Sequence, residues 1–188
     1  MSKSLISLFA VALVSSGCSV AIRKPMLQTE RPRFEAHPQA ARVIFVRPSR
    51  AFGAAIGTHI TDGSRAQMGD AVSGTTFAVD VAPGRHQFCV GNFASSGPIV
   101  EADLQPGSTY MLRVDIAGGY PYLTPIVDRR DAEKLVKGAR GTEFGGVEDP
   151  KAMGQGDLNL VFGRCSERSA RLNERDRSKF VLEQGDAL

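Results

Sequence analysis

Short alternating segments between residues 40 and 128, each closed by a turn, most constrain the fold of this chain. In the clearest of them, residues 109–116, the apolar side chains of Tyr110, Leu112 and Val114 alternate with side chains that face the other way. A period of two residues is typical of a β-strand with one face buried. The pattern therefore predicts a mainly β domain.

The other predicted strands are equally short, and turns such as Asp62-Gly63 and Ala82-Pro83-Gly84 separate them. They cover residues 43–46, 55–61, 64–68, 75–81, 85–90, 100–104 and 122–127. No long helix lies between them, which argues against a parallel α/β sheet. Periodicity alone does not separate a sandwich from a barrel. We expect a small antiparallel β-sandwich of about seven strands with a C-terminal helical and loop extension.

The N-terminus has the order of a secretory signal peptide, predicted over residues 1–17. Lys3 is followed by the apolar run 5–14 and then by small residues up to Gly17. The apolar run has about half of the roughly 20 residues that a membrane-spanning helix needs. The segment therefore indicates export and not a permanent membrane helix.

Ser15-Ser16-Gly17-Cys18 resembles the lipobox of bacterial lipoproteins, in which the Cys thiol carries acyl chains such as palmitate and the chain is cut before it. The lipobox usually has Leu where this chain has Ser15. Ordinary signal-peptidase cleavage is the alternative, because Ser15 and Gly17 also satisfy the small-x-small rule. We expect lipidation of Cys18 and a membrane anchor through it. Ser19, in place of Asp, favours the outer membrane, with the protein facing the periplasm.

The predicted domain boundaries follow from these segments. Residues 18–38 form a lipidated N-terminus and a tether, because three prolines and no sustained period favour an extended chain. Residues 39–128 form the β-sandwich, and residues 129–188 form the C-terminal extension. Within the extension, Asp128 and Gly138 are suited to cap a helix. A Gly-rich loop follows up to residue 156, and the run 158–162 is predicted as one more strand.

Four arginines in the extension are spaced so that they share one face of a helix: Arg164, Arg168, Arg171 and Arg175. One interpretation is a basic strip for anionic lipid, lipopolysaccharide or an acidic partner. The alternative, which we favour at this point, is a solvated helix in which Glu167 and Arg171 pair.

Composition limits the classes of partner. The chain has 23 Lys and Arg against 20 Asp and Glu, a net charge of +3, which does not indicate a nucleic-acid partner. The hydrophobic fraction of 42% is that of an ordinary globular protein.

No catalytic or metal-binding pattern stands out. Three His are present, and no Gly-x-Ser-x-Gly element presents a nucleophile. His86 follows a turn and is expected to bond a loop carbonyl. An offset of three places His86 and Cys89 on opposite faces of a strand, which is unsuitable for a shared metal. We expect no enzyme activity, no metal and no cofactor.

Two cysteines remain beside Cys18. Paired cysteines are common in oxidising compartments, so we propose a disulfide between Cys89 and Cys165 that pins the extension to the sandwich. The alternative is two unreactive thiols.

Several short motifs occur in a joint order: Val46-Arg47-Pro48-Ser49, Asp62-Gly63, Val81-Ala82-Pro83-Gly84-Arg85-His86, and Leu104 with Gly107 and Tyr110. In that order the chain resembles an uncharacterised domain of secreted bacterial lipoproteins, itself similar to PEGA and carboxypeptidase-regulatory-like β-sandwiches. The resemblance covers residues 40–128 and implies a small β-sandwich without catalytic residues.

The sequence favours a non-enzymatic structural or protein-interaction module of the envelope, with contacts through a sheet edge or the tail. The alternative is a domain that binds a small ligand or glycan through the Arg-rich tail and three tyrosines: Tyr110, Tyr120 and Tyr122.

Overall fold

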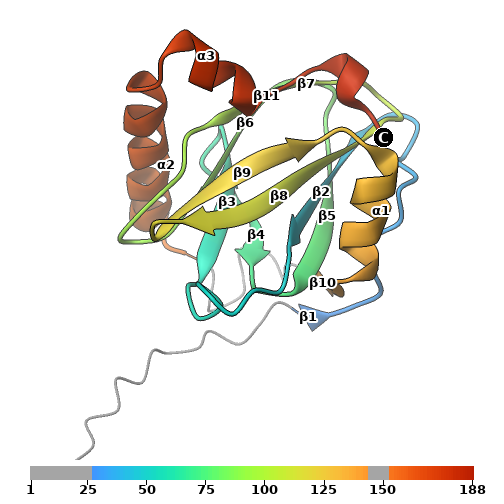
Figure 1. Ribbon diagram of the computed structural model, residues 1–188. Helices are drawn as coiled ribbons and strands as arrows, with labels where there is room; N and C mark the ends of the chain where they lie inside the picture. The colour runs from blue at the N-terminus through green and yellow to red at the C-terminus, as the bar shows by residue number, and fades with distance from the viewer. Residues whose placement is uncertain (1–26, 144–152) are drawn as a thin grey trace, which may run out of the picture.

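The computed structural model describes residues 27–143 and 153–188, and within them two β-sheets pack face to face (Figure 1). The first sheet has six strands, in the spatial order β1 (Leu27–Gln28), β10 (Arg140–Glu143), β5 (Thr75–Val81), β2 (Ala41–Arg47), β8 (Thr109–Ala117) and β9 (Tyr120–Ile126). The second has five, in the order β11 (Val181–Leu182), β7 (Val100–Leu104), β6 (Gly84–Gly91), β3 (Thr58–Asp62) and β4 (Gln67–Ala71). The mainly β prediction is confirmed.

Both sheets are mixed, so the prediction of an antiparallel sandwich of about seven strands is wrong in its finer part. Strand β2 runs parallel to β8, β10 parallel to β5, and β11 parallel to β7. After β2 the chain enters the second sheet as β3 and β4 and returns to the first as β5. It then crosses again as β6 and β7 before it enters β8 at the end where β2 began. Periodicity shows which face of a strand is buried, but it does not show which partner the strand meets. The extra strands are two to four residues long and carry no detectable period.

The predicted strand at 158–162 is also wrong, because this segment belongs to the helix α2 (Gln155–Ala170). The buried side chains of Leu158, Val161, Phe162 and Cys165 recur at offsets of three, four and seven. That is a helical stripe, and five residues were too few to separate it from an apolar strand. The helices α1 (Arg129–Lys137) and α3 (Glu174–Arg177) and two 3-10 turns, η1 (Ser178–Phe180) and η2 (Gln184–Asp186), complete the extension.

The main core lies between the sheets and centres on three aromatic rings. Phe45 stacks on Phe77 with ring centroids 5.2 Å apart and meets Phe88 edge-on at 5.8 Å. Tyr110 is fully buried, and its hydroxyl accepts a hydrogen bond from the Gln105 amide at 3.0 Å. The inward faces predicted from alternation are therefore the faces that form this core.

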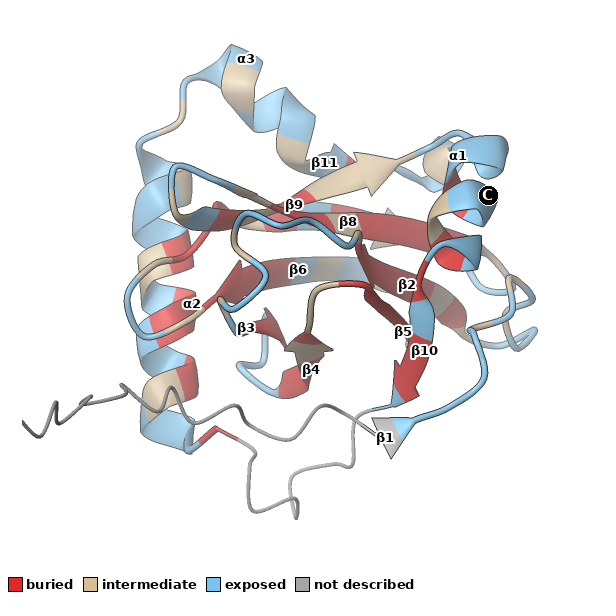
Figure 2. Ribbon diagram, turned by 60° about the horizontal axis from the view of Figure 1, so that its bottom comes forward, coloured by how far each residue is buried: buried red, intermediate tan, exposed pale blue. Residues whose placement is uncertain are grey.

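A helix covers the outer face of each sheet, and its buried residues face the sandwich in Figure 2. Helix α1 packs Ala132 and Val136 against the first sheet. Asp128 caps its first turn by accepting from the Asp131 amide, and Gly138 ends it, as the sequence predicted. Helix α2 packs its apolar stripe against the second sheet.

The segment before β2 lies against the domain. The Thr29 amide donates to the Gly141 carbonyl, and Arg31 Nε donates to the Ala139 carbonyl at 2.9 Å. The Phe34 carbonyl accepts from the Thr109 hydroxyl, and the Phe34 ring packs beside α1. Residues 29–34 therefore pack along one side of the first sheet.

Candidate functional site

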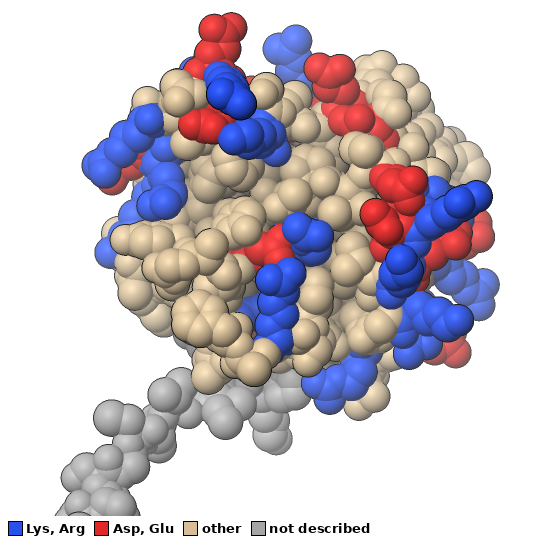
Figure 3. Space-filling view, viewed as in Figure 1, with Lys and Arg blue, Asp and Glu red and all other residues tan. Residues whose placement is uncertain are grey.

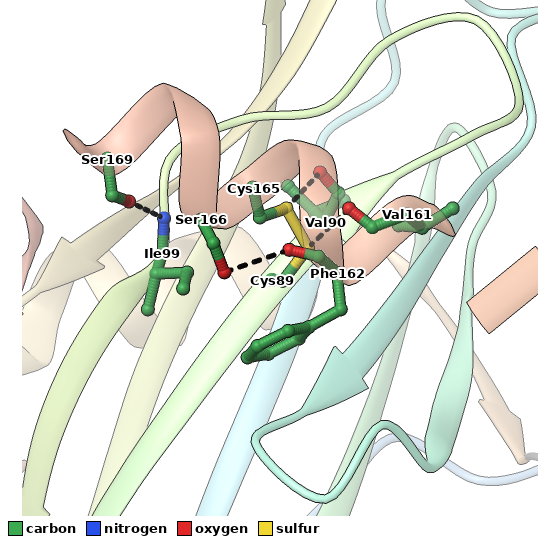
Figure 4. The surroundings of a disulfide bond; sticks show 8 residues. All are labelled: Cys89, Val90, Ile99, Val161, Phe162, Cys165, Ser166 and Ser169. Carbon is green, nitrogen blue, oxygen red and sulfur yellow. Dashed lines mark hydrogen bonds between the residues drawn. A yellow bond between two sulfur atoms is a disulfide. The ribbon is translucent and has the colours of Figure 1, made fainter. Parts of the chain in front are cut away.

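Helix α2 is joined to the second sheet by a disulfide between Cys89 on β6 and Cys165 on α2 (Figure 4). Both cysteines are fully buried, with Cα atoms 6.1 Å apart. One turn further along, Ser169 Oγ accepts a hydrogen bond from the Ile99 amide at 2.7 Å. The structure thus brings together the two cysteines that the sequence singled out, and two attachments hold α2 in place. Cys18 lies outside the described residues.

The disulfide sets which face of α2 is exposed. The buried stripe faces β6, so Arg164 and Arg168 lie on the outward side, and Arg171 caps the helix at its C-terminal end. Arg175 falls in α3, a separate helix, and does not continue the row. Three of the four arginines predicted to share a face therefore do so.

These three arginines border a surface depression of about 440 Å³. Its other walls come from the β6–β7 loop, residues 92–99, and from the hairpin that joins β8 to β9. We name it the arginine pocket and define it by six residues: Ser95, Ser96, Tyr120, Arg164, Arg168 and Arg171. Figure 3 shows basic side chains along the edge of the molecule where α2 lies.

Short hydrogen bonds preorganise the walls of the arginine pocket. Asn92 Oδ1 accepts from the amides of Ala94 and Ser95 at 2.9 and 2.8 Å, a local turn that shapes the β6–β7 loop. Ser95 Oγ then donates to the Gly119 carbonyl at 3.1 Å, which ties this loop to the β8–β9 hairpin. The pocket is therefore built from three elements that are fastened to one another.

Two of the arginines are held in place by groups of the pocket wall. The guanidinium of Arg168 lies 4.3 Å above the centre of the Tyr120 ring, a cation–π contact. The guanidinium of Arg164 donates to the Phe93 carbonyl. Because each contact uses only part of the guanidinium, both side chains keep donors for a ligand.

The pocket carries excess positive charge, because three arginines and one carboxylate, that of Glu167, line it. Within the described residues, no carboxylate lies in ion-pair range of these arginines, and Glu167 does not form the pair with Arg171 that the sequence suggested. Arg42 and Arg113, in contrast, each hold an Asp at 2.6–2.7 Å. Planar guanidinium groups bind phosphate and carboxylate with paired hydrogen bonds. The arrangement is therefore suited to an anionic group.

The histidines lie elsewhere. His86 Nε2 donates to the Ala82 carbonyl at 2.7 Å, which is the structural role predicted for it. His59 is 5% exposed, and its Nδ1 lies 2.6 Å from Asp70 Oδ1. Gln67 Nε2 bonds the same Asp70 oxygen, and Gln67 Oε1 accepts from the Met153 amide beneath α2. This buried group joins β3, β4 and the start of α2, and none of it borders the arginine pocket.

A larger groove of about 570 Å³ runs between β6, β7 and the C-terminal residues. Its charges are mixed but mainly acidic, with Arg85 against Glu101, Asp103 and Glu183. Gln184 bridges across by donating to Asp103 Oδ2 at 3.0 Å and accepting from Gln105. Because Gln184 already bonds polar groups across this groove, whereas the three arginines have no ion pair within the described residues, the arginine pocket is the better candidate.

Sequence reasoning found the arginines by their spacing but missed the loop that faces them. Phe93, Ser95 and Ser96 come from a Gly/Ser-rich stretch that has no period, so only the fold shows that they meet α2.

Among residues 27–143 and 153–188, no three His, Cys, Asp or Glu side chains are grouped as metal ligands, and no helix is long and apolar enough to cross a bilayer. No protein-family model, curated protein or solved structure matches the chain. What the pocket binds is therefore argued from its own chemistry.

Proposed function

We propose that this protein is a lipid-anchored, periplasm-facing protein of the bacterial cell envelope whose β-sandwich is a non-enzymatic interaction module. The observation that carries the proposal is the arginine pocket: three cationic side chains without carboxylate partners in the described chain, on a helix that a disulfide holds in place. A preorganised, positively charged surface is built to bind an anionic partner.

The compartment follows from the sequence and the disulfide together. Disulfides persist in oxidising compartments such as the periplasm, and the buried Cys89–Cys165 bond supports export. The anchor at Cys18 and its outer-membrane location rest on the sequence around it, and the resemblance to secreted lipoprotein domains stays a prediction.

The chemistry of the pocket favours binding over catalysis. Its arginines stay protonated and supply donors only, so they do not act as bases. Ser95 Oγ already donates to the Gly119 carbonyl, and neither His59 nor His86 lines the pocket. The residues present can hold and orient a negative group, and none of them is placed as an activated nucleophile.

A small ligand is the second candidate, and the tyrosines narrow its chemistry. Tyr110 is buried in the core and cannot meet a ligand. Tyr120 is 46% exposed, but Arg168 covers one face of its ring. A sugar needs an open ring face to stack on, whereas an anion needs the guanidinium. Because Arg168 takes one face of the Tyr120 ring and three guanidinium groups line the pocket, we propose that its ligand carries phosphate or carboxylate.

The anchor is tested by acyl labelling and membrane fractionation of the wild-type chain and of Cys18→Ser. Wild type should incorporate label and sediment with membranes, and C18S should lose both; Ser19→Ala, which leaves the acylation site intact, is the matched control for labelling. Equal labelling of C18S and wild type would remove the anchor from the proposal.

Interaction through the pocket is tested with a photo-crosslinking residue at Phe93, beside the pocket, or at Val127, which is 57% exposed at the opposite end. Adducts to envelope components should form from position 93 and disappear in the double variant Arg164→Gln/Arg168→Gln. Equal adducts from the two positions would contradict the proposal.

A further inference from the structure

Three aromatic side chains are exposed at one end of the sandwich. Phe52 is 71% exposed, Phe93 48% and Tyr120 46%. They come from three different connections, namely residues 48–57, the β6–β7 loop and the β8–β9 hairpin. Exposed aromatic residues that gather on one surface mark a contact site.

The strand pairing explains why these connections share one end. Strand β8 runs parallel to β2, so the hairpin after β8 lies at the same end as the loop after β2. That loop leads into β3, where His59 pairs with Gly91 at the end of β6. The β6–β7 loop therefore lies at this end as well, and the His59 and Phe93 rings meet there at 6.4 Å.

Phe52 is presented by a fixed loop. The buried guanidinium of Arg47 donates to the carbonyls of Gly53 and Ile56 at 2.6 Å, on both sides of the turn. Arg50 reaches Asp115 on β8 at 3.4 Å. The loop has its own internal anchors, so the exposure of Phe52 is a built feature of the surface.

The described chain also begins at this end. Thr29 bonds Gly141, and the Arg140 amide donates to the Gly74 carbonyl at 2.9 Å. The Gly74 amide in turn donates to the carbonyl of Arg47, where the Phe52 loop starts, at 2.9 Å. Figure 1 shows β1 at the bottom of the molecule, near this loop.

Chain length then limits how far this end can lie from an anchor. Cys18 and Leu27 are nine residues apart, which spans at most about 30 Å. This step rests on the proposed acylation of Cys18. With that anchor in place, the end that carries the aromatic residues is within reach of the bilayer surface.

We propose that this end of the sandwich docks on the headgroup layer of the anionic membrane that carries the anchor. Phe52, Phe93 and Tyr120 enter the interface between headgroups and acyl chains, where aromatic rings are favoured. Arg164 and Arg168 of the arginine pocket bind lipid phosphates beside them. In Figure 3 the lower left face combines a broad uncharged surface with basic side chains at its edge, the pattern that such docking needs.

Vesicle co-sedimentation tests the docking without the anchor. The protein is the chain from residue 18 with Cys18→Ser, which keeps every described residue. Vesicles contain phosphatidylethanolamine with phosphatidylglycerol, or phosphatidylcholine alone. We expect the protein to bind the anionic vesicles, with an affinity that falls as salt is added. In Arg164→Gln/Arg168→Gln the affinity should fall about fivefold for each arginine removed. Phe52→Ser/Phe93→Ser should also lower the affinity.

Matched controls lie at the far end. Arg130→Gln/Lys134→Gln removes two cations from α1, and Val127→Ser removes an exposed apolar side chain; neither should change binding. Circular dichroism is used to check that each variant is folded. Equal binding to both vesicle types, or equal losses in the α1 control, would overturn the proposal.

The lipid anchor at Cys18 and the docking on the membrane can be disproved independently of each other. Labelled Cys18 in the full chain with no vesicle binding by the C18S protein would overturn the docking alone. Unlabelled Cys18 with vesicle binding that needs Arg164 and Arg168 would overturn the anchor and keep the docking. Adducts from position 93 to a protein, without vesicle binding, would identify a protein as the occupant and overturn the lipid proposal.

Discussion

A few polar side chains do most to shape the loops of this small sandwich, and Arg47 is the clearest case. It is 4% exposed, and its guanidinium donates to the carbonyls of Gly53, Ile56 and Ala71. Burial lowers the pKa of Arg47 from its usual value, and an arginine side chain keeps its proton at physiological pH, so the group remains charged. One side chain thus joins three backbone carbonyls, of which those of Gly53 and Ala71 also accept from the Ile56 amide and the Thr58 hydroxyl.

Replacing Arg47 by Lys keeps the charge but removes the planar fork. An ammonium group on a shorter stem cannot reach three carbonyls at once, so at least one of these carbonyls loses its charged donor. We expect R47K to lower the free energy of unfolding by about 2 kcal/mol, measured by urea denaturation. Arg50→Lys, at a position with a 62% exposed side chain, is the matched control and should be near neutral. If R47K lost no more stability than R50K, the planar guanidinium of Arg47 would not be important for stability.

Asp80 gives a prediction for acid stability. It pairs with Arg42 across β5 and β2, with bonds of 2.7 and 2.8 Å, and the hydrogen bond from Arg42 lowers the pKa of Asp80 below its usual 3.8. A carboxylate with a lowered pKa stabilises the fold above that usual value, and the contribution is lost as pH falls through the folded pKa. Both side chains are partly exposed, so we expect Asp80→Asn to cost about 0.5–1 kcal/mol near neutral pH.

The pH dependence of this stability loss tests whether the Asp80–Arg42 ion pair causes it. The difference between D80N and wild type should shrink as pH falls below about 4 and should be absent once Asp80 is protonated in the folded state. Urea denaturation across this range measures it. A difference that stays constant with pH would assign the cost to packing and not to the ion pair.

At the scale of elements, α2 shows how packing selects between two local structures. Its first apolar residues fit a short strand, but the stripe that continues to Cys165 fits a helix, and β6 accepts that helix closely. A Cβ on Gly91 would lie 2.7 Å from Val161 Cγ1, so only Gly allows this approach. The covering helix is therefore specified partly by a residue on the strand beneath it.

The disulfide should contribute most of what holds α2 in place. Cys89 and Cys165 are 76 residues apart, and closing such a loop stabilises a fold by about 4 kcal/mol in the chain-entropy model. We expect Cys89→Ala/Cys165→Ala to lower the free energy of unfolding by about that amount. Wild type with a reductant should match the double variant, because both lack the bond. Equal stability of wild type with and without reductant would contradict the assignment.

For the whole molecule, alternation predicted which residues enter the core but not how the strands are ordered. Strand β5 was predicted with its observed bounds, and so was β7. The strands that pair with β5 and β7 depend on which sheet the chain enters after residues 48–57. The alternation of apolar and polar residues is the same in either case, so it does not predict this choice. At the site, spacing brought out Arg164 and Arg168, whereas Phe93 meets Arg164 only because α2 packs against β6.

The two ends of the described chain extend the sheets. Strand β1 extends the first sheet through β10, and β11 extends the second by running parallel to β7. The Leu188 amide donates to the Thr109 carbonyl at 2.8 Å, so the last residue is bonded to the strand that starts the β8–β9 hairpin. A domain closed in this way should depend on its terminal residues as much as on its central strands.

Two adjacent residues of β11 test that dependence. Leu182 is 1% exposed and packs in the main core, whereas Val181 is 38% exposed on the other face of the same strand. We expect Leu182→Ala to cost about 3 kcal/mol through lost burial and the cavity left behind, and Val181→Ala to stay within about 0.5 kcal/mol. Urea denaturation of the two variants compares them directly. If L182A lowered the free energy of unfolding as little as V181A, strand β11 would add nothing to the stability of the sandwich. A much larger loss in L182A would mean that β11 unfolds together with the rest of the domain.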